Sequence, residues 1–164
     1  MNIRLEKEGD EAAIGRLTNR AFSQTPHASG QEAAIIEQLR VDGDLALSLV
    51  AAEDDQIIGH VAFSPVRIGT KENGWFGLGP LSVDPDRQGC GIGSQLALDG
   101  LKTLRDRQAR GCVVLGDPAY YARFGFRSDG KLTYGEVPPA FLQWISFGDE
   151  SPIGEISYRP GFDV

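Results

Sequence analysis

The chain has 164 residues, 41% of them hydrophobic, and a formal net charge of −7. This size and composition predict one globular domain over residues 1–164, and the acidic balance argues against a protein that binds nucleic-acid phosphates non-specifically. Its two cysteines and two histidines share no metal-ligand spacing, so we expect neither a disulfide framework nor a metal site. Without an apolar run of bilayer length or a signal-peptide core, we expect a cytoplasmic protein with no membrane partner.

The N-terminal part of the sequence predicts one short strand followed by two helices. Apolar and charged residues alternate over residues 3–6, which indicates the strand. Asp10 is a favourable N-cap for the first helix, and residues 29–32 resemble a capping box for the second. Apolar residues recur at helical spacing after both signals: Ile14, Leu17 and Ala21, then Ile35, Ile36 and Leu39.

Three extended segments follow, over residues 45–52, 57–68 and 75–83. Residues 53–56 are polar and predict the first turn between them. Asn73 and Gly74 form a strong tight-turn signal before the third segment. Extended segments joined by short turns predict an antiparallel meander.

The hydrophobic period changes after residue 86. Residues 93–104 place apolar and small side chains on one helical face, which predicts a helix packed close to the sheet. Residues 112–115 read as a buried strand, and residues 116–118 open a short helix that carries Tyr120 and Tyr121. The remaining residues, 124–164, mix extended segments with prolines. The pattern predicts an α+β domain around one mixed sheet.

Residues 81–94 place a strand, a glycine-rich turn and a helix start in succession. The first N–H groups of a helix lack intrahelical partners and lie at the positive end of its dipole, so this arrangement binds anions. A P-loop is excluded because no Lys follows the last glycine. A dinucleotide-binding turn is disfavoured because Gly89, Gly91 and Gly93 have the wrong spacing and the loop follows an antiparallel meander.

Residues 88–93 resemble the acetyl-CoA pyrophosphate signature of the GCN5-related N-acetyltransferase (GNAT) family, Gln/Arg-x-x-Gly-x-Gly/Ala. Residues 81–85 resemble the end of the family's fourth strand, and residues 121–126 resemble its Tyr-x-x-x-Gly-Phe motif. Segments 79–83, 116–121 and 137–139 are most similar to the YhbS-like bacterial subgroup. The resemblance implies the three-layer α/β GNAT fold, with a mostly antiparallel sheet of about seven strands splayed between strands 4 and 5, and about four helices.

The resemblance also implies acetyl-CoA as co-substrate, without a metal. Many members of the family carry an Asn seven residues before the motif tyrosine, where this chain has Val114, so we assign the corresponding contact to Asp117 instead. A glycine turn without a ligand is the competing interpretation of the loop. The residues assigned to the co-substrate are Leu81, Ser82, Val83, Arg87, Gln88, Gly89, Cys90, Gly91, Ile92, Gly93, Ser94, Asp117 and Tyr121.

By the same resemblance, the acetyl group passes directly to a primary amine of a small molecule or peptide in a ternary complex. The Val83 N–H is the expected donor to the acetyl carbonyl, and Tyr121 is the expected acid that protonates the departing thiolate or hydrogen-bonds to it. Packing of Tyr121 in the core is the competing interpretation, and Tyr120 is a second candidate acid. Asp117, Glu32 and His60 are conceivable bases for the amine. Cys90 has no His partner at a suggestive spacing, which argues against a nucleophile.

The alternative to an enzyme is a non-catalytic acyl-CoA sensor or interaction module, and a nucleotide-binding module is third. Homodimers are common in the family, and the sequence does not decide the oligomeric state. The acceptor pocket is expected near the two early helices and the strand 6–7 region, with four aromatic side chains as candidates for its wall: Phe22, His27, Trp144 and Phe147.

Overall fold

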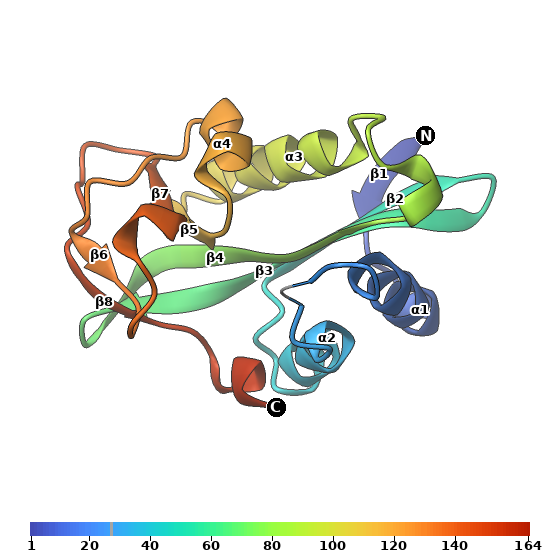
Figure 1. Cartoon of the computed structure of the whole chain (residues 1–164), viewed down its shortest axis with the longest axis horizontal. Helices are drawn as coiled ribbons and strands as arrows, with labels where there is room; N and C mark the ends of the chain where they lie inside the picture. The colour runs from blue at the N-terminus through green and yellow to red at the C-terminus, as the bar shows by residue number, and fades with distance from the viewer. Residues whose placement is uncertain (27) are drawn as a thin grey trace.

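The computed structural model describes residues 1–26 and 28–164, and His27 lies outside the described residues. A twisted sheet is covered by helices on both faces (Figure 1). Its strands are β1 (Asn2–Leu5), β2 (Leu47–Glu53), β3 (Gln56–Ile68), β4 (Lys71–Val83), β5 (Gly111–Leu115), β6 (Leu132–Thr133), β7 (Leu142–Ser146) and β8 (Gly154–Ser157). Its α-helices are α1 (Glu11–Phe22), α2 (Glu32–Val41), α3 (Ile92–Asp106) and α4 (Pro118–Tyr121).

The order of the strands in the sheet is β1-β2-β3-β4-β5-β7, and β8 pairs with β3 and with the short β6. Neighbouring pairs are antiparallel except β4–β5 and β6–β8. The α+β expectation with one mixed sheet is confirmed, with eight strands where about seven were expected.

The strands β4 and β5 separate partway along their length. They pair only from Trp75 opposite Gly111 to Leu78 opposite Val114. Beyond that point, residues 79–83 of β4 continue alongside β3 alone. A wedge therefore opens between β4 and β5, as the family resemblance implied.

The turn between β3 and β4 corrects one prediction. Ile68 pairs with Lys71, so the turn consists of Gly69 and Thr70, whereas Asn73 and Gly74 lie inside β4. Gly69 has φ +65° and supplies the left-handed conformation that a two-residue hairpin turn requires. The Asn-Gly prediction was wrong about the position of the turn: the chain reverses at Gly69 and Thr70, and Asn73 and Gly74 fall where the register between β3 and β4 shifts, with Gly74 at φ +82°.

The helix caps differ from the sequence patterns in detail. Asp10 does occupy the N-cap of α1, but its carboxylate bonds to Arg4 (2.8 Å) and to the Lys7 N–H (2.9 Å), not to the helix. Helix α2 begins at Glu32, with Gln31 as its N-cap. The predicted partners Ser29 and Glu32 do bond, since the Ser29 hydroxyl and N–H both donate to the Glu32 carboxylate.

Helix α3 packs very closely on the sheet, as its small residues predicted. A Cβ added at Gly100 would lie 2.3 Å from the ring of Phe63 on β3. The face formed by Gly93, Leu96, Ala97, Gly100, Leu101 and Leu104 is buried. Figure 1 shows α3 and α4 on one face of the sheet and α1 and α2 on the other.

A buried polar chain crosses β2 and β3 on the face of the sheet opposite Phe63. The Ser48 hydroxyl donates to Glu6 (2.7 Å) and lies 2.8 Å from His60 Nε2, while Glu6 also pairs with Arg40 (2.9 Å). His60 is 0% exposed, and its Nδ1 has no hydrogen-bond partner among the described residues. Burial lowers the pKa of His60 from 6.5 to about 4, although Glu6 partly opposes that shift.

Because folded His60 stays neutral at pH values where the unfolded chain binds a proton, we expect stability to fall as pH decreases from 6.5 towards 4. Between pH 7.5 and 5.5 the loss is about 1 kcal/mol. Urea unfolding of the wild type and of His60→Gln at both pH values measures it. The variant is expected to lose the pH dependence in this window, and an unchanged dependence would contradict the assignment to His60.

Candidate active site

The end of β4 presents backbone groups to the wedge in an alternating pattern. The Asp84 N–H donates to Ile58 of β3 (2.9 Å). Since successive residues of a strand point their N–H groups to opposite sides, Ser82 also faces β3, and Leu81 and Val83 face away from it. The Ser82 side chain is buried as well, at 1% exposure. Of the three strand residues assigned to the co-substrate, Leu81 and Val83 therefore point their N–H groups away from β3, and the Val83 carbonyl accepts from the Gln88 side-chain amide (3.4 Å).

The loop after β4 is fixed at its start by Asp84. The Asp84 carboxylate accepts from the Asp86 N–H (2.9 Å) and pairs with Arg20 of α1 (2.9 Å). Further along, Gly89 and Gly91 have φ +81° and +84°. Residues with a Cβ rarely adopt this conformation, so the path of the loop requires glycine at both positions.

Helix α3 begins directly after this loop with an open N-terminus. Its N-cap is Gly91, which has no side chain to cap the first N–H groups. A Cβ at Gly93 would lie 2.9 Å from the Tyr120 hydroxyl and 3.5 Å from Val83. The helix start, the strand end and α4 therefore meet closely, and N–H groups remain available to an anion.

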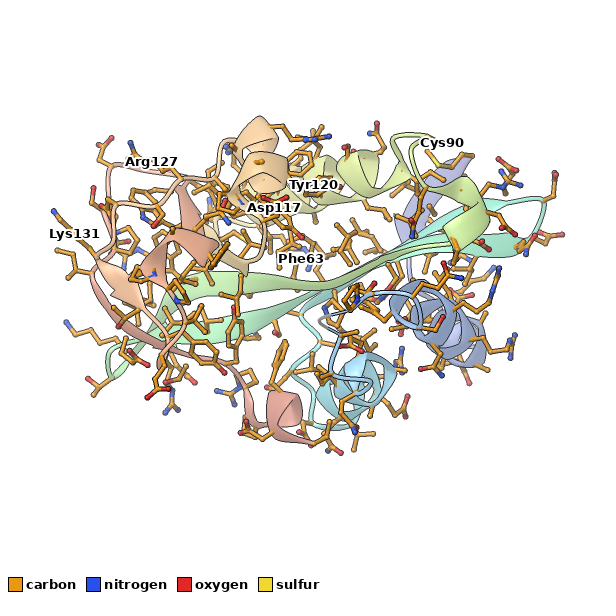
Figure 2. All side chains as sticks on the ribbon, viewed as in Figure 1. Phe63, Cys90, Asp117, Tyr120, Arg127 and Lys131 are labelled. Atoms are coloured by element: carbon orange, nitrogen blue, oxygen red, sulfur yellow. The ribbon has the colours of Figure 1, made fainter. Side chains whose placement is uncertain are left out.

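A cavity of about 510 Å³ lies over this helix start. The predicted residues Arg87 and Gln88 line it, and Arg87 also pairs with Glu53. Cys90 is exposed in the loop before α3, while Asp117 and Tyr120 lie by α4 (Figure 2). The lining residues are Ala21, Phe22, Thr25, Leu81, Val83, Arg87, Gln88, Gly89, Gly91, Ile92, Gly93, Ser94, Tyr120 and Arg123.

The two tyrosines of α4 face different surroundings. Tyr120 lines the cavity over the helix start, with the Arg123 guanidinium 4.6 Å from its ring centre. Tyr121 packs against Gly116, Phe124 and Phe126 and lies away from that cavity. Burial, with smaller contributions from Tyr120 and Cys112, raises the pKa of Tyr121 to about 12.

Asp117 is the N-cap of α4 and accepts from the Ala119 N–H (2.9 Å). Its side chain is exposed and does not line this cavity. The structure thus gives Asp117 a local role in the helix start, and its contact with the co-substrate stays a prediction.

A second cavity, of about 370 Å³, lies where the wedge opens towards α1, α2 and the C-terminal segment. Leu81 and Phe22 line both cavities, so the two meet at the end of β4. The lining residues are Phe22, Glu32, Ile35, Leu78, Gly79, Pro80, Leu81, Leu115, Tyr121, Tyr134, Tyr158 and Phe162.

A strand end whose N–H groups face away from β3, a glycine loop and an open helix start form the arrangement that the GNAT resemblance implied. The family model described as "Acetyltransferase (GNAT) domain" matches residues 44–128, which include all three. The chain belongs to the GNAT family. The YhbS N-acetyltransferase of Escherichia coli (strain K12), described as uncharacterized, is 43% identical over 127 residues, which cover 77% of this chain and 73% of the relative.

Two solved GNAT structures resemble the chain over almost its whole length. One is a GNAT family acetyltransferase from Brucella melitensis in complex with acetyl-CoA, which is 46% identical to this chain and superposes with a TM-score of 0.89. The match covers 99% of this chain and 97% of the Brucella chain. The other is Escherichia coli YhbS in complex with CoA, with a TM-score of 0.91 and 35% identity. That match covers 99% of this chain and 92% of the YhbS chain. The family and fold expectations are confirmed.

Within this GNAT domain, the structure distinguishes the three conceivable bases. Glu32 lines the second cavity together with Tyr121, whereas His60 is buried inside the sheet layer and lines neither cavity. Among the described residues, no group of three or more His, Cys, Asp or Glu side chains is arranged to hold a metal ion. Likewise, no helix in residues 1–26 and 28–164 has the length and apolar character needed to cross a membrane.

The aromatic residues expected around the acceptor pocket are placed differently by the structure. Phe22 does line the second cavity. Trp144 is instead buried in the core at 1% exposure, and Phe147 lies under the Arg105 guanidinium. The sequence analysis missed the aromatic wall, which comes from Tyr134, Tyr158 and Phe162. These residues follow short strands in the poorly patterned C-terminal third, where no signal marked them.

Proposed function

We propose that the protein is an acetyl-CoA-dependent N-acetyltransferase that transfers the acetyl group directly to a primary amine of a small molecule or peptide. The observation that carries the proposal is the meeting of two cavities at Leu81. One cavity lies over an uncapped helix start suited to phosphates, and the other is lined by Tyr121 and a carboxylate. A donor and an acceptor bound in these cavities would meet at the end of β4.

The residues over the helix start fit the pyrophosphate of acetyl-CoA. The first N–H groups of α3 have no side-chain cap, and Gly93 lets Tyr120 approach the helix start so closely that an added Cβ would lie 2.9 Å from its hydroxyl. Arg87 and Arg123 line the cavity and supply positive charge for a phosphate, although the charge of Arg87 is shared with Glu53. When bound, acetyl-CoA supplies the acetyl group as an activated thioester.

Two groups of the chain are assigned to the transfer itself. The Val83 N–H faces the wedge and donates to the acetyl carbonyl oxygen, a kind of contact worth about 2.7–4 kcal/mol in a transition state. The Tyr121 hydroxyl donates a hydrogen bond to the departing sulfur. Because the pKa of Tyr121 is raised to about 12, full proton transfer to a thiolate of pKa about 8.5 is uphill by roughly 5 kcal/mol, so donation of a hydrogen bond is favoured.

Binding of acetyl-CoA is the first test of this function. At about 100 times its dissociation constant, acetyl-CoA adds about 2.7 kcal/mol of stability, which raises the melting midpoint by roughly 5–10 °C for a domain of this size. Thermal melts with acetyl-CoA, with ATP and with NAD measure the shift. We expect a shift with acetyl-CoA alone.

Each result of these melts has a clear meaning. A folded protein without a shift would contradict the proposal and leave the glycine loop as a structural turn. A shift with ATP or NAD of equal size would favour a nucleotide-binding module. Binding of acetyl-CoA without thiol release in the presence of any amine would favour the non-catalytic acyl-CoA sensor.

A further inference from the structure

The second cavity combines one charge with an apolar and aromatic wall. Among the described residues that line it, Glu32 is the one with a charged side chain. The remaining side chains are aliphatic or aromatic, apart from the phenolic hydroxyls of its tyrosines. Glu32 is partly exposed, so solvent screens its carboxylate in part, and that carboxylate is the charge that draws a cation towards this apolar wall.

The Glu32 carboxylate is held in place and kept ionised. The Ser29 hydroxyl (2.8 Å) and the Ser29 N–H (2.9 Å) both donate to it. Burial alone would raise the pKa of Glu32, but these hydrogen bonds outweigh burial, and its pKa lies below the ordinary 4.5. At neutral pH the cavity therefore carries a fixed negative charge.

The aromatic wall of Tyr134, Tyr158 and Phe162 suits both the apolar part of an amine ligand and its positive charge. Tyr158 is the centre of a cluster, with its ring centre 5.2 Å from that of Tyr134 and 4.8 Å from that of Phe162. Aromatic faces attract cations and bury apolar surface at the same time. The volume of about 370 Å³ is in the lower part of the range of small-molecule sites, about 300–1,000 Å³.

We infer that the acceptor is a small primary amine with one positive charge, carried on an aromatic or branched apolar group, and that Glu32 binds its ammonium. The inference rests on the proposed function, because it identifies the second cavity as the acceptor site. An acceptor that also bears a carboxylate would be repelled by Glu32. A strongly polar amine would leave the aromatic wall without a partner.

Glu32 acts in this assignment by recognition and orientation. An alkylammonium has a pKa of about 10, as in lysine, so a carboxylate of pKa below 4.5 holds its proton only weakly. The ion pair brings the amine into the cavity beside Tyr121, and the proton leaves to water before attack. The expected effect of changing Glu32 is accordingly on amine binding and KM more than on kcat.

The test measures ligand binding to the full chain saturated with CoA by isothermal titration calorimetry. Three probes separate the contributions: 2-phenylethylamine, ethanolamine, which keeps the ammonium without the ring, and 3-phenylpropanoate, which keeps the ring with the opposite charge. We expect 2-phenylethylamine to bind at least about tenfold more tightly than ethanolamine. The acid is expected not to bind.

Glu32→Gln should weaken 2-phenylethylamine binding by about 10–100-fold, the usual worth of a hydrogen bond to a charged group. Glu37→Gln is the matched control, because Glu37 lies exposed on the same helix and lines neither cavity. Its binding should equal that of the wild type. In Glu32→Gln the new amide oxygen can still accept from Ser29, and the acetyl-CoA melt shift checks that each variant is folded.

Results that contradict the acceptor inference differ from results that would contradict the acetyltransferase function itself. Equal binding of the two amines, tight binding of the acid, or no binding of 2-phenylethylamine to CoA-saturated protein would overturn the inference. Equal affinities in Glu32→Gln and Glu37→Gln would overturn the role of Glu32. The wild-type comparison of ligands decides the point even if a variant is unstable. Absence of CoA binding itself, seen in the melts, would instead contradict the acetyltransferase proposal.

Discussion

Tyr121→Phe is expected to lower kcat for acetyl transfer by about 10–100-fold, with little change in acetyl-CoA affinity. The substitution removes the hydroxyl and keeps the ring, which packs against Gly116 and Phe126. Because Tyr121 lines the second cavity and none of the hydrogen bonds among the described residues uses its hydroxyl, the loss of that hydroxyl leaves no protein partner unsatisfied. Thiol release from acetyl-CoA with a saturating amine measures kcat.

Tyr120→Phe is the matched control for this experiment. The Tyr120 hydroxyl approaches the start of α3 near Gly93 and faces the other cavity. Its removal is expected to raise KM for acetyl-CoA and to leave kcat nearly unchanged. An unaltered kcat in Tyr121→Phe, or an equal loss in Tyr120→Phe, would show that the hydroxyl of Tyr121 has no special part in the transfer.

Gly100→Ala is expected to lower the free energy of unfolding by about 1–3 kcal/mol, although Ala is the better helix former. The added Cβ would lie 2.3 Å from Phe63, and both residues are enclosed between α3 and the sheet. Either α3 or the Phe63 ring must shift. For a domain of this size the melting midpoint should fall by several degrees, about 2–4 °C per kcal/mol.

Two further variants test the physical reason for this loss. Gly15→Ala in α1 adds the same methyl group where nothing lies within 4 Å, so it should stabilise the protein by about 0.5–1 kcal/mol. In a Phe63→Leu background, Gly100→Ala should cost less than in the wild type, because the smaller side chain gives it room. An equal cost in both backgrounds would show that the contact with Phe63 is not the cause.

Local patterns predicted most of the elements correctly. The period of apolar residues predicted α1, α2 and α3, alternation predicted β1, and extended runs between turn signals predicted the meander, because these patterns span only a few neighbouring residues. The misplaced turn between β3 and β4 also came from a local pattern. Asn73 and Gly74 favour a turn in isolation, yet the chain reverses at Gly69 and Thr70, and the two residues lie inside β4 where its register with β3 shifts.

The candidate site also contains one part that the sequence predicted and one part that only the structure brought together. The glycine loop and Tyr121 were found in the sequence, since a phosphate-binding helix start needs adjacent residues and therefore leaves a contiguous motif. By contrast, Tyr158 and Phe162 carry no motif, and the capping-box pattern that includes Glu32 says nothing of a shared cavity. The three residues line one cavity only because α2 and the C-terminal segment pack on the same face of the sheet.

By itself, then, the sequence determined the GNAT family, the order of the elements and the glycine loop that opens α3. The tertiary structure decided which N–H groups of β4 point away from β3, because that depends on the register with β3. It also decided that Glu32 shares a cavity with Tyr121 while His60 does not. The physical reason is range: propensity and periodicity act over a few neighbouring residues, whereas the walls of a cavity are set by packing between segments distant in sequence.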